Sequence, residues 1–284
     1  MQEDPIVIVG AARTPMGGFQ GSLSGLSAPE LGGHAIKAAL KRAGVPAEDV
    51  QDLIMGLCLF AGVKQAPARQ AAHNAGIPWE AGATTISKMC GSAMKATILA
   101  HDNILAGSHD VMIAGGMESM SNAPYILPKA RGGYRLGHGD VAKDHMFIDG
   151  LEDAFDEGRL MGTFAEDTAE HYQFTREAQD AFAIESLTRA KKAVEDGTFV
   201  PEVEPIAVKT RKGETLMEDD EQPFNANIDK IPQLKPAFRK DGTVTPANSS
   251  SISDGAAALV LMKRSEAEKR GLVTIAVLHA HSTH

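Results

Sequence analysis

The amino-acid sequence predicts an α/β fold, and three observations support that class. Short β-branched apolar runs alternate along the chain with Ala-rich segments of helical spacing. A glycine follows most of the helical segments, as expected where a helix ends in a left-handed residue. The 284 residues are 43% hydrophobic, enough for one large domain or two smaller ones with a buried core. The alternation implies helices layered on a sheet that is at least partly parallel.

Local composition predicts each element in turn. Residues 6–9 are apolar and β-branched and fit a buried strand. Residues 28–43 place Leu31, Ala35 and Leu40 on one helical face. Residues 93–106 contain no Pro or Gly and are apolar round much of their circumference, so a buried helix is expected there. Further strands are expected at 53–58, 83–86, 110–116, 256–262 and 273–280, and further helices at 67–75, 167–196 and 265–270, the last capped by Ser265.

The composition of the sequence changes after Met117. Residues 119–150 are rich in Gly, Pro, Ser and charge and show little periodicity. The region up to about residue 240 is therefore expected to form an insertion with its own small structure. Its first part contains a locally basic patch, which is either a solvated loop or a contact for a phosphate or a partner: Lys129, Arg131, Arg135, His138 and Lys143.

Charge and cysteine content narrow the class of protein. The net charge of -9 argues against non-specific nucleic-acid binding, which needs a basic face. The 2 cysteines do not make a disulfide framework, so a secreted scaffold is not expected. The N-terminus is acidic and lacks a signal-peptide pattern, and no apolar run reaches membrane-spanning length. A cytoplasmic protein without a membrane segment is expected.

Cys90 is the first candidate for chemistry, because it lies where a strand is expected to turn into a helix. The first N–H groups of a helix carry partial positive charge and favour a thiolate. Gly91 and Ser92 are small, so a substrate carbonyl could approach the sulfur closely. The pattern alone leaves a second interpretation open, in which Cys90 is a small buried hydrophobe. Cys58 is interpreted as a core residue.

Two glycine- or serine-rich loops are further candidates for ligand contact. Residues 244–255 are small and polar, and a ligand loop and a plain polar turn fit them equally well. Residues 10–25 contain several glycines, but their spacing fits neither a dinucleotide fingerprint nor a Walker motif. His279, His281 and His284 form a short His-rich end, which is expected to be incidental rather than a metal site.

Five motifs in register resemble the thiolases over essentially the whole chain. They are Ala11-Ala12-Arg13-Thr14-Pro15, Pro67-Ala68-Arg69-Gln70-Ala71-Ala72, Lys88-Met89-Cys90-Gly91-Ser92, Ala114 to Ser121, and Asn248 to Ala258. The stretch 61–72 favours the acetyl-CoA acetyltransferase type. The resemblance implies a layered α-β-α fold of two similar halves, with a loop domain inserted in the first. It implies boundaries at 1–118 and 244–272 for the first half, 119–243 for the insertion, and 273–284 for the start of a second half.

The resemblance also implies a function and a site. Cys90 would be the acylated nucleophile, and coenzyme A would be a substrate rather than a cofactor. The pantetheine and adenine path would be lined by Ser250, Ala247, Phe238, Met161 and Leu151. The reaction would convert two acetyl-CoA into acetoacetyl-CoA and CoA, or run in reverse as thiolysis. A homo-oligomer, dimer or tetramer, is expected.

The Asn-Glu-Ala-Phe, Gly-His-Pro and Cys-x-Gly-Gly-Gly motifs of the thiolase second half do not occur in these 284 residues. Little turnover is therefore expected of this chain alone. The alternative is a CoA-binding or oligomerising module without turnover, and a ketoacyl synthase or a thiolase-like lipid carrier is a rival within the superfamily. Without the second half, residues 273–278 would be an exposed apolar strand edge without partners, and such an edge favours aggregation.

Overall fold

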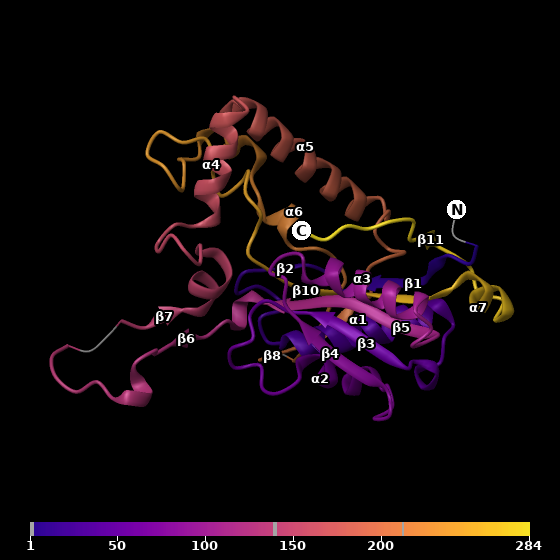
Figure 1. Ribbon diagram of the computed structural model, residues 1–284. Coiled ribbons are helices and arrows are strands. Elements are labelled where there is room, and N and C mark those ends of the chain that lie inside the picture. The colour runs from indigo at the N-terminus through magenta and orange to yellow at the C-terminus, as the bar shows by residue number, and fades with distance from the viewer. Residues whose placement is uncertain (1–2, 139–140, 212) are drawn as a thin grey trace.

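The computed structural model describes residues 3–138, 141–211 and 213–284, and a mixed sheet forms its centre (Figure 1). The strand order is β11-β1-β10-β5-β3-β4, with β2 paired to β10. β3 is parallel to β4 and β5, whereas β10 is antiparallel to β5 and β1. The prediction of a partly parallel sheet is confirmed. The strands are β1 (Ile6–Arg13), β2 (Gly17–Gly18), β3 (Asp52–Gly56), β4 (Gly82–Ile86), β5 (Val111–Ser119), β10 (Ser253–Lys263) and β11 (Ala276–Val277).

Helices cover both faces of this sheet. On one face α1 (Ala28–Ala43) and α2 (Pro67–Ala75) pack on alternate strand residues such as Ile113. On the other face α3 (Ser92–Leu105) packs on the residues between them, such as Met112. Because side chains alternate across a strand, each buried strand contributes to both clusters. The layered α-β-α architecture expected from the sequence is confirmed.

α3 is only partly covered, so the expectation of a buried helix is wrong for part of its surface. Ala96, Ala100 and Ile104 are buried against the sheet. Met94 lies on the opposite side of the helix and is 73% exposed. The apolar circumference of α3 therefore leaves an apolar surface that faces solvent in this structure.

Residues 119–243 form several small elements, most of which stand away from the sheet. Figure 1 shows α4 and α5 above the sheet and the β6–β7 segment extended to one side. The hairpin of β8 and β9 instead packs against Leu23 and Leu31, at the foot of α1. The elements are β6 (Tyr125–Ile126), β7 (Lys143–Asp144), a π-helical turn (Met146–Leu151), α4 (Met161–His171), α5 (Arg176–Glu195), β8 (Ile206–Thr210), β9 (Gly213–Met217) and α6 (Gln222–Asn225), with 3-10 turns at Met120–Asn122, Ala130–Gly132 and Ile228–Gln233.

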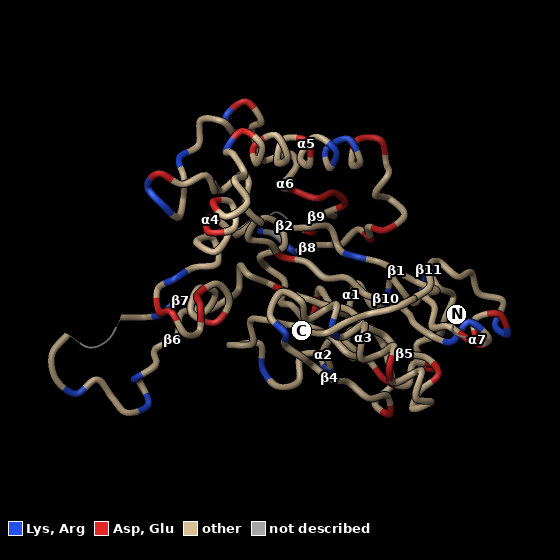
Figure 2. Tube along the Cα trace, turned by 45° about the horizontal axis from the view of Figure 1, so that its top comes forward, with Lys and Arg blue, Asp and Glu red and all other residues tan. Residues whose placement is uncertain are grey.

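The basic patch predicted in the insertion lies on the extended loop between β6 and β7 (Figure 2). Arg131, Arg135 and His138 are exposed, and Lys143 is half-buried in β7. Figure 2 shows the blue segments of this loop on the side of the molecule away from α7 (Arg264–Lys269). Both interpretations of the patch, a solvated loop and an anion contact, remain compatible with this placement.

The single helix expected over residues 167–196 is wrong, because two helices meet there at an angle. Gln173 adopts a left-handed φ of 56°, which no α-helix accommodates. Thr175 then caps α5, and its side-chain oxygen accepts a hydrogen bond from the N–H of Ala178. The apolar repeat that suggested one continuous helix, Ala183, Leu187, Ala190 and Val194, lies entirely within α5.

Two expectations near the C-terminal end also need correction. Ser265 does not cap α7; its N–H and hydroxyl donate to the Asp4 carboxylate, and Lys263 is the N-cap residue. The strand expected over 273–280 shrinks to β11. It has a partner, since Leu278 N–H donates to Ile6 and Ile275 N–H donates to Ile8. The expectation of an unpartnered apolar edge is therefore wrong for the side that faces β1.

Among the helices of the described ranges, none combines the length and the apolar character that crossing a bilayer requires.

Candidate active site

Cys90 lies in a tight turn between the end of β4 and the start of α3. Met89 adopts a left-handed φ of 51°, an uncommon conformation for a side chain of this size. Ser92 holds the turn: its hydroxyl accepts the N–H of Lys88 at 2.8 Å and donates to the carbonyl of Met89 at 2.5 Å. Gly91 is the N-cap residue of α3. The Cys90 side chain thus precedes the helix directly and is exposed.

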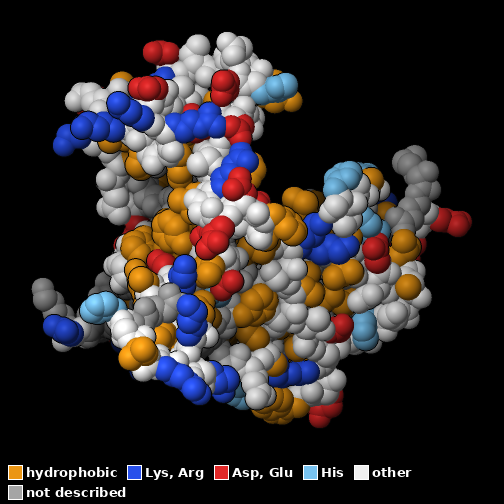
Figure 3. All heavy atoms as spheres, turned by 60° about the vertical axis from the view of Figure 1, so that its left-hand side comes forward, with side chains coloured by type: hydrophobic (Ala, Val, Ile, Leu, Met, Phe, Trp, Pro, Cys, Tyr) orange, Lys and Arg blue, Asp and Glu red, His pale blue; other side chains and the backbone are white. Residues whose placement is uncertain are grey.

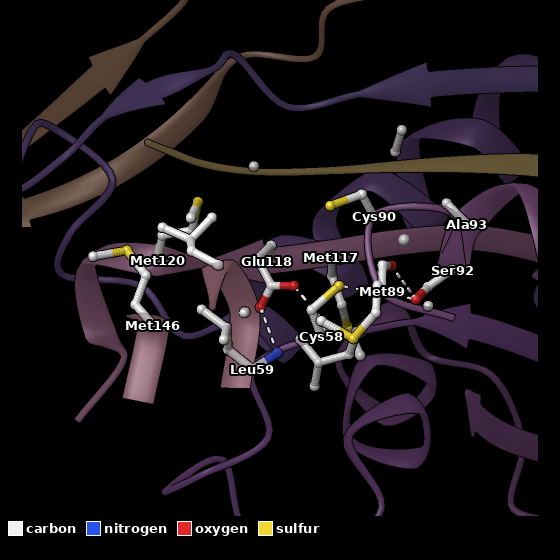
Figure 4. Close-up of a pocket in the computed structure, with 17 residues that line it drawn as sticks. Cys58, Leu59, Met89, Cys90, Ser92, Ala93, Met117, Glu118, Met120 and Met146 are labelled. Carbon is white, nitrogen blue, oxygen red and sulfur yellow. Dashed lines mark hydrogen bonds between the residues drawn. The ribbon is translucent and has the colours of Figure 1, made fainter. Parts of the chain in front are cut away.

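The Cys90 sulfur opens onto a cavity of about 340 Å³. Figure 4 shows Cys90 and Met89 on one side of this cavity and Met120 and Met146 on the other. The lining is mostly apolar and rich in sulfur. It comprises Gly56, Leu57, Cys58, Leu59, Met89, Cys90, Ser92, Ala93, Gly116, Met117, Glu118, Met120, Met146, Gly150, Leu151, Gly255 and Ala257.

Glu118 is the acidic residue in this lining, and sequence reasoning did not single it out. Its carboxylate accepts the N–H groups of Cys58 at 2.8 Å and Leu59 at 3.2 Å. Burial raises the pKa of Glu118 above its ordinary value, although these hydrogen bonds act in the opposite direction. Glu118 comes from β5 and the other two residues follow β3, so the bonds fix the chain after β3 beside the neighbouring strand.

Cys58 is not the core residue that the sequence suggested. It is partly exposed and lines the same cavity as Cys90. Its sulfur lies 3.9 Å from the Ser92 hydroxyl. Burial, followed by the nearby negative charge of Glu118, raises the pKa of the Cys58 thiol to about 11. Cys58 therefore stays a neutral thiol at neutral pH.

The π-helical turn Met146–Leu151 forms the cavity wall on the side of the insertion. His145, just before it, is buried; its Nε2 accepts the N–H of Ala61 at 3.2 Å. Its Nδ1 then carries the proton and donates to Asp149 at 2.6 Å. The turn is thereby fixed against the loop that precedes α2, which positions Met146 and Leu151.

Leu151 also lines a second cavity, of about 940 Å³, between the insertion and the loop before β10. Phe238, Met161 and Ser250 line this second cavity too. Figure 3 shows hydrophobic side chains gathered in the hollow between the upper part of the molecule and its body. Leu151 is thus shared by the Cys90 cavity and by a larger apolar space.

Phe238 packs closely on α4, because Gly162 has no side chain. A Cβ atom at Gly162 would lie 2.2 Å from the Phe238 ring. Ala247, the fifth residue expected along the ligand path, does not line this second cavity. It lines a neighbouring cavity of about 870 Å³ beside α5, which also contains Ser250. The structure therefore brings four of the five expected residues together and places Ala247 next to them.

Comparisons with known proteins agree with this arrangement. The family profile described as "Thiolase, N-terminal domain" matches residues 6–265. Acetyl-CoA acetyltransferase of Pseudomonas aeruginosa is 48% identical over 280 residues, which span 98% of this chain and 71% of that protein. Acetyl-CoA acetyltransferase of Cupriavidus necator is 46% identical over 279 residues, with 98% and 70% covered.

Solved structures show the same likeness. Acetyl-CoA acetyltransferase from Syntrophomonas wolfei superimposes with a TM-score of 0.91 at 40% identity, covering 97% of this chain and 69% of that one. Acat5 thiolase from Ascaris suum, solved in complex with coenzyme A, gives a TM-score of 0.90 at 38% identity, covering 97% and 70%. The motif resemblance and the layered fold are both confirmed. By profile, sequence and structure together, this chain belongs to the thiolases, a family of enzymes, and matches their N-terminal domain.

Proposed function

We propose that Cys90 transfers acyl groups between coenzyme A thioesters. The reaction is the condensation of two acetyl-CoA to acetoacetyl-CoA and CoA, or the reverse thiolysis. One observation carries the proposal: an exposed cysteine directly before a helix opens onto an apolar cavity, which shares Leu151 with the larger second cavity. The relatives named acetyl-CoA acetyltransferase support the acyl group and its carrier.

The first half of this reaction uses the Cys90 turn directly. The Cys90 thiolate attacks the carbonyl carbon of acetyl-CoA and forms a new C–S bond. The bond between that carbon and the CoA sulfur breaks, and CoA leaves as a thiolate that takes up a proton. Gly91, the N-cap residue of α3, directly follows the attacking Cys90. The cavity beside Cys90 offers mostly apolar surface to the acetyl group of the resulting thioester.

We assign the larger second cavity to the CoA moiety and call it the CoA groove. Phe238, Met161 and Leu151 offer apolar surface to the pantetheine arm, and Ser250 offers a hydroxyl. Ala247 lies beside this path, in the adjoining cavity with Ser250. The relative solved with coenzyme A superimposes on 97% of this chain, which supports the assignment.

Mass spectrometry of the intact chain after incubation with acetyl-CoA tests the proposal. The wild-type chain should gain one acetyl group, and the Cys90→Ala variant should gain none. The Cys58→Ser variant is the matched cysteine control and should still be acetylated, because a thiol with a pKa of about 11 is not the attacking group. An adduct that persists in Cys90→Ala would refute the assignment. CoA binding without any adduct would select the alternative, a CoA-binding module without turnover.

Self-association into a dimer or tetramer also stays a proposal from the family resemblance. Light scattering across a dilution series measures it. A single monomer mass at all concentrations would contradict it.

A further inference from the structure

A second cluster of ligating side chains lies on α3, away from the Cys90 cavity. His101 and Asp102 are in the C-terminal part of α3, and His281 is in the segment that follows β11. His101 Nδ1 and His281 Nε2 each lie 2.9 Å from the same carboxylate oxygen of Asp102. The three ligand atoms all lie within 4.8 Å of one another.

The fold holds this cluster in place from two directions. His101 is buried against the sheet, with its side chain only 9% exposed. The segment with His281 is anchored three residues earlier, where Leu278 N–H donates to the carbonyl of Ile6. The two rings meet edge to face, with centroids 5.0 Å apart. Asp102 and His281 stay accessible, at 48% and 31% side-chain exposure.

The donor atoms at the cluster suit a transition-metal cation. Asp102 offers a carboxylate oxygen, and His101 and His281 each offer an imidazole nitrogen. Imidazole nitrogens combined with one carboxylate are a donor set for Zn²⁺ and neighbouring transition metals rather than for Mg²⁺ or Ca²⁺.

We propose that His101, Asp102 and His281 bind one Zn²⁺ ion, with the remaining coordination position left to water. Three protein ligands and one water give the tetrahedral coordination that Zn²⁺ prefers. Asp102 already holds both imidazoles beside one oxygen, so small shifts of the three side chains bring all three ligands onto one ion. This site uses none of the residues assigned to acyl transfer, and it is independent of the proposed function.

The ion would fix the C-terminal segment along α3. Beyond His281, Thr283 accepts a hydrogen bond from Lys95 Nζ at 3.3 Å. Figures 1 and 2 both place the C-terminal end beside α3. A Zn²⁺ ion at His281 would therefore add a metal contact to the hydrogen bond between Thr283 and Lys95, which holds this segment on α3.

Equilibrium dialysis of the metal-free chain against Zn²⁺, with the bound metal counted per chain, tests the site. The wild-type chain should bind one ion, and Asp102→Asn and His281→Ala should each weaken binding about tenfold or more. His279→Ala is the matched control, since it removes an exposed histidine from the same segment and should bind as the wild type does. Equal affinity in all four proteins would overturn the proposal, as would no binding to the wild type.

Co²⁺ as a spectroscopic probe separates this site from the two cysteines. Substitution by Co²⁺ should give the visible bands of a tetrahedral nitrogen and oxygen site. A sulfur-to-metal charge-transfer band would instead locate the ion at Cys58 or Cys90 and refute the assignment. Because Asp102 and His281 are partly exposed, their variants should keep the wild-type circular dichroism spectrum, so that lost binding is not lost folding.

Discussion

Gly56, at the end of β3, is the residue on which the Cys90 turn rests. A Cβ atom there would lie 2.6 Å from the backbone nitrogen of Ala93 and 2.6 Å from the Ser92 Cβ. The first turn of α3 therefore lies directly on the backbone of β3. Only a residue without a side chain permits this approach, and the approach sets the height of Cys90 above the sheet.

We expect Gly56→Ala to displace the start of α3. The added methyl group has no space, and forcing it in should lower the free energy of unfolding by about 1–3 kcal/mol. The Cys90 turn should move with the helix, so acetylation by acetyl-CoA should slow even where the variant remains folded. Urea unfolding and the rate of adduct formation measure the two effects separately.

Gly25→Ala is the matched control for this substitution. In the described part of the chain, no neighbouring atom lies within 4 Å of the place that a Cβ atom at Gly25 would take. The stability of Gly25→Ala should therefore stay within about 0.5 kcal/mol of the wild type. If Gly56→Ala were as stable and as readily acetylated as Gly25→Ala, the close packing of α3 on β3 would not govern the Cys90 turn.

At the scale of elements, Glu166 joins α4 to the loop before β10. Glu166 is buried, and its carboxylate accepts the N–H groups of Thr243 and Val244 and the hydroxyl of Thr243. Burial raises the pKa of Glu166, but these hydrogen bonds outweigh it and leave the pKa below the ordinary 4.5. The same loop continues into Ser250, so this contact also shapes the proposed CoA groove.

The lowered pKa of Glu166 gives a pH dependence with a definite sign. Ionised Glu166 stabilises the fold above pH 4.5, and that contribution should be lost as the pH falls through the lower folded-state pKa. We expect Glu166→Gln to be less stable by about 1–3 kcal/mol at neutral pH, because it loses acceptors for buried donors. The difference from the wild type should shrink in acid, as measured by urea unfolding across pH.

Glu170→Gln on the same helix is the control. The Glu170 side chain is 75% exposed and forms a surface ion pair with Arg239, so its change should lie within about 0.5 kcal/mol. If the free energy of unfolding of Glu166→Gln changed with pH in parallel with that of the wild type, ionised Glu166 would not contribute the expected pH-dependent stability.

Local sequence predicted elements well wherever the chain itself marks their ends. The bounds of α1 and α2 agree with the predicted ranges, since a proline opens each helix and a left-handed glycine closes it. Local sequence failed at Gln173, where a non-glycine residue in a left-handed conformation divides the expected helix. The exposure of α3 was equally hidden, because burial depends on what packs against a helix and not on its own composition.

At the scale of the whole molecule, some residues of the candidate site could be named from the sequence and others could not. Motifs and family resemblance named Cys90 and five further residues; four of the five line one cavity, and their role in CoA binding stays a proposal. Glu118 and Cys58 could not be placed, because their contact depends on the pairing of β3 with β5, which no local pattern encodes. The approach of His281 to Asp102, 179 residues earlier in the chain, is still less accessible to sequence reasoning.

Arg13 joins the sheet to the segment that follows β9, across a sequence separation of 207 residues. Its guanidinium donates two hydrogen bonds to Asp220, at 2.7 and 3.0 Å, and one to Glu202 at 2.7 Å. Asp220 also accepts the N–H of Met16 at 2.8 Å. The side chains of Arg13 and Asp220 are 18% and 9% exposed, so the pair is largely removed from solvent.

We expect Arg13→Ala to cost about 3 kcal/mol, because it leaves the Asp220 carboxylate buried without its counter-charge. The free energy of unfolding of Arg13→Lys should lie between those of the wild type and Arg13→Ala, since an ammonium group cannot form the bidentate pair. Arg189→Ala, which breaks an exposed pair with Glu185 on α5, should change stability by no more than about 0.5 kcal/mol. Urea unfolding measures all three, and a double-mutant cycle with Asp220→Asn isolates the coupling. A coupling energy near zero would mean that the insertion is held to the sheet by packing of the β8–β9 hairpin rather than by this ion pair.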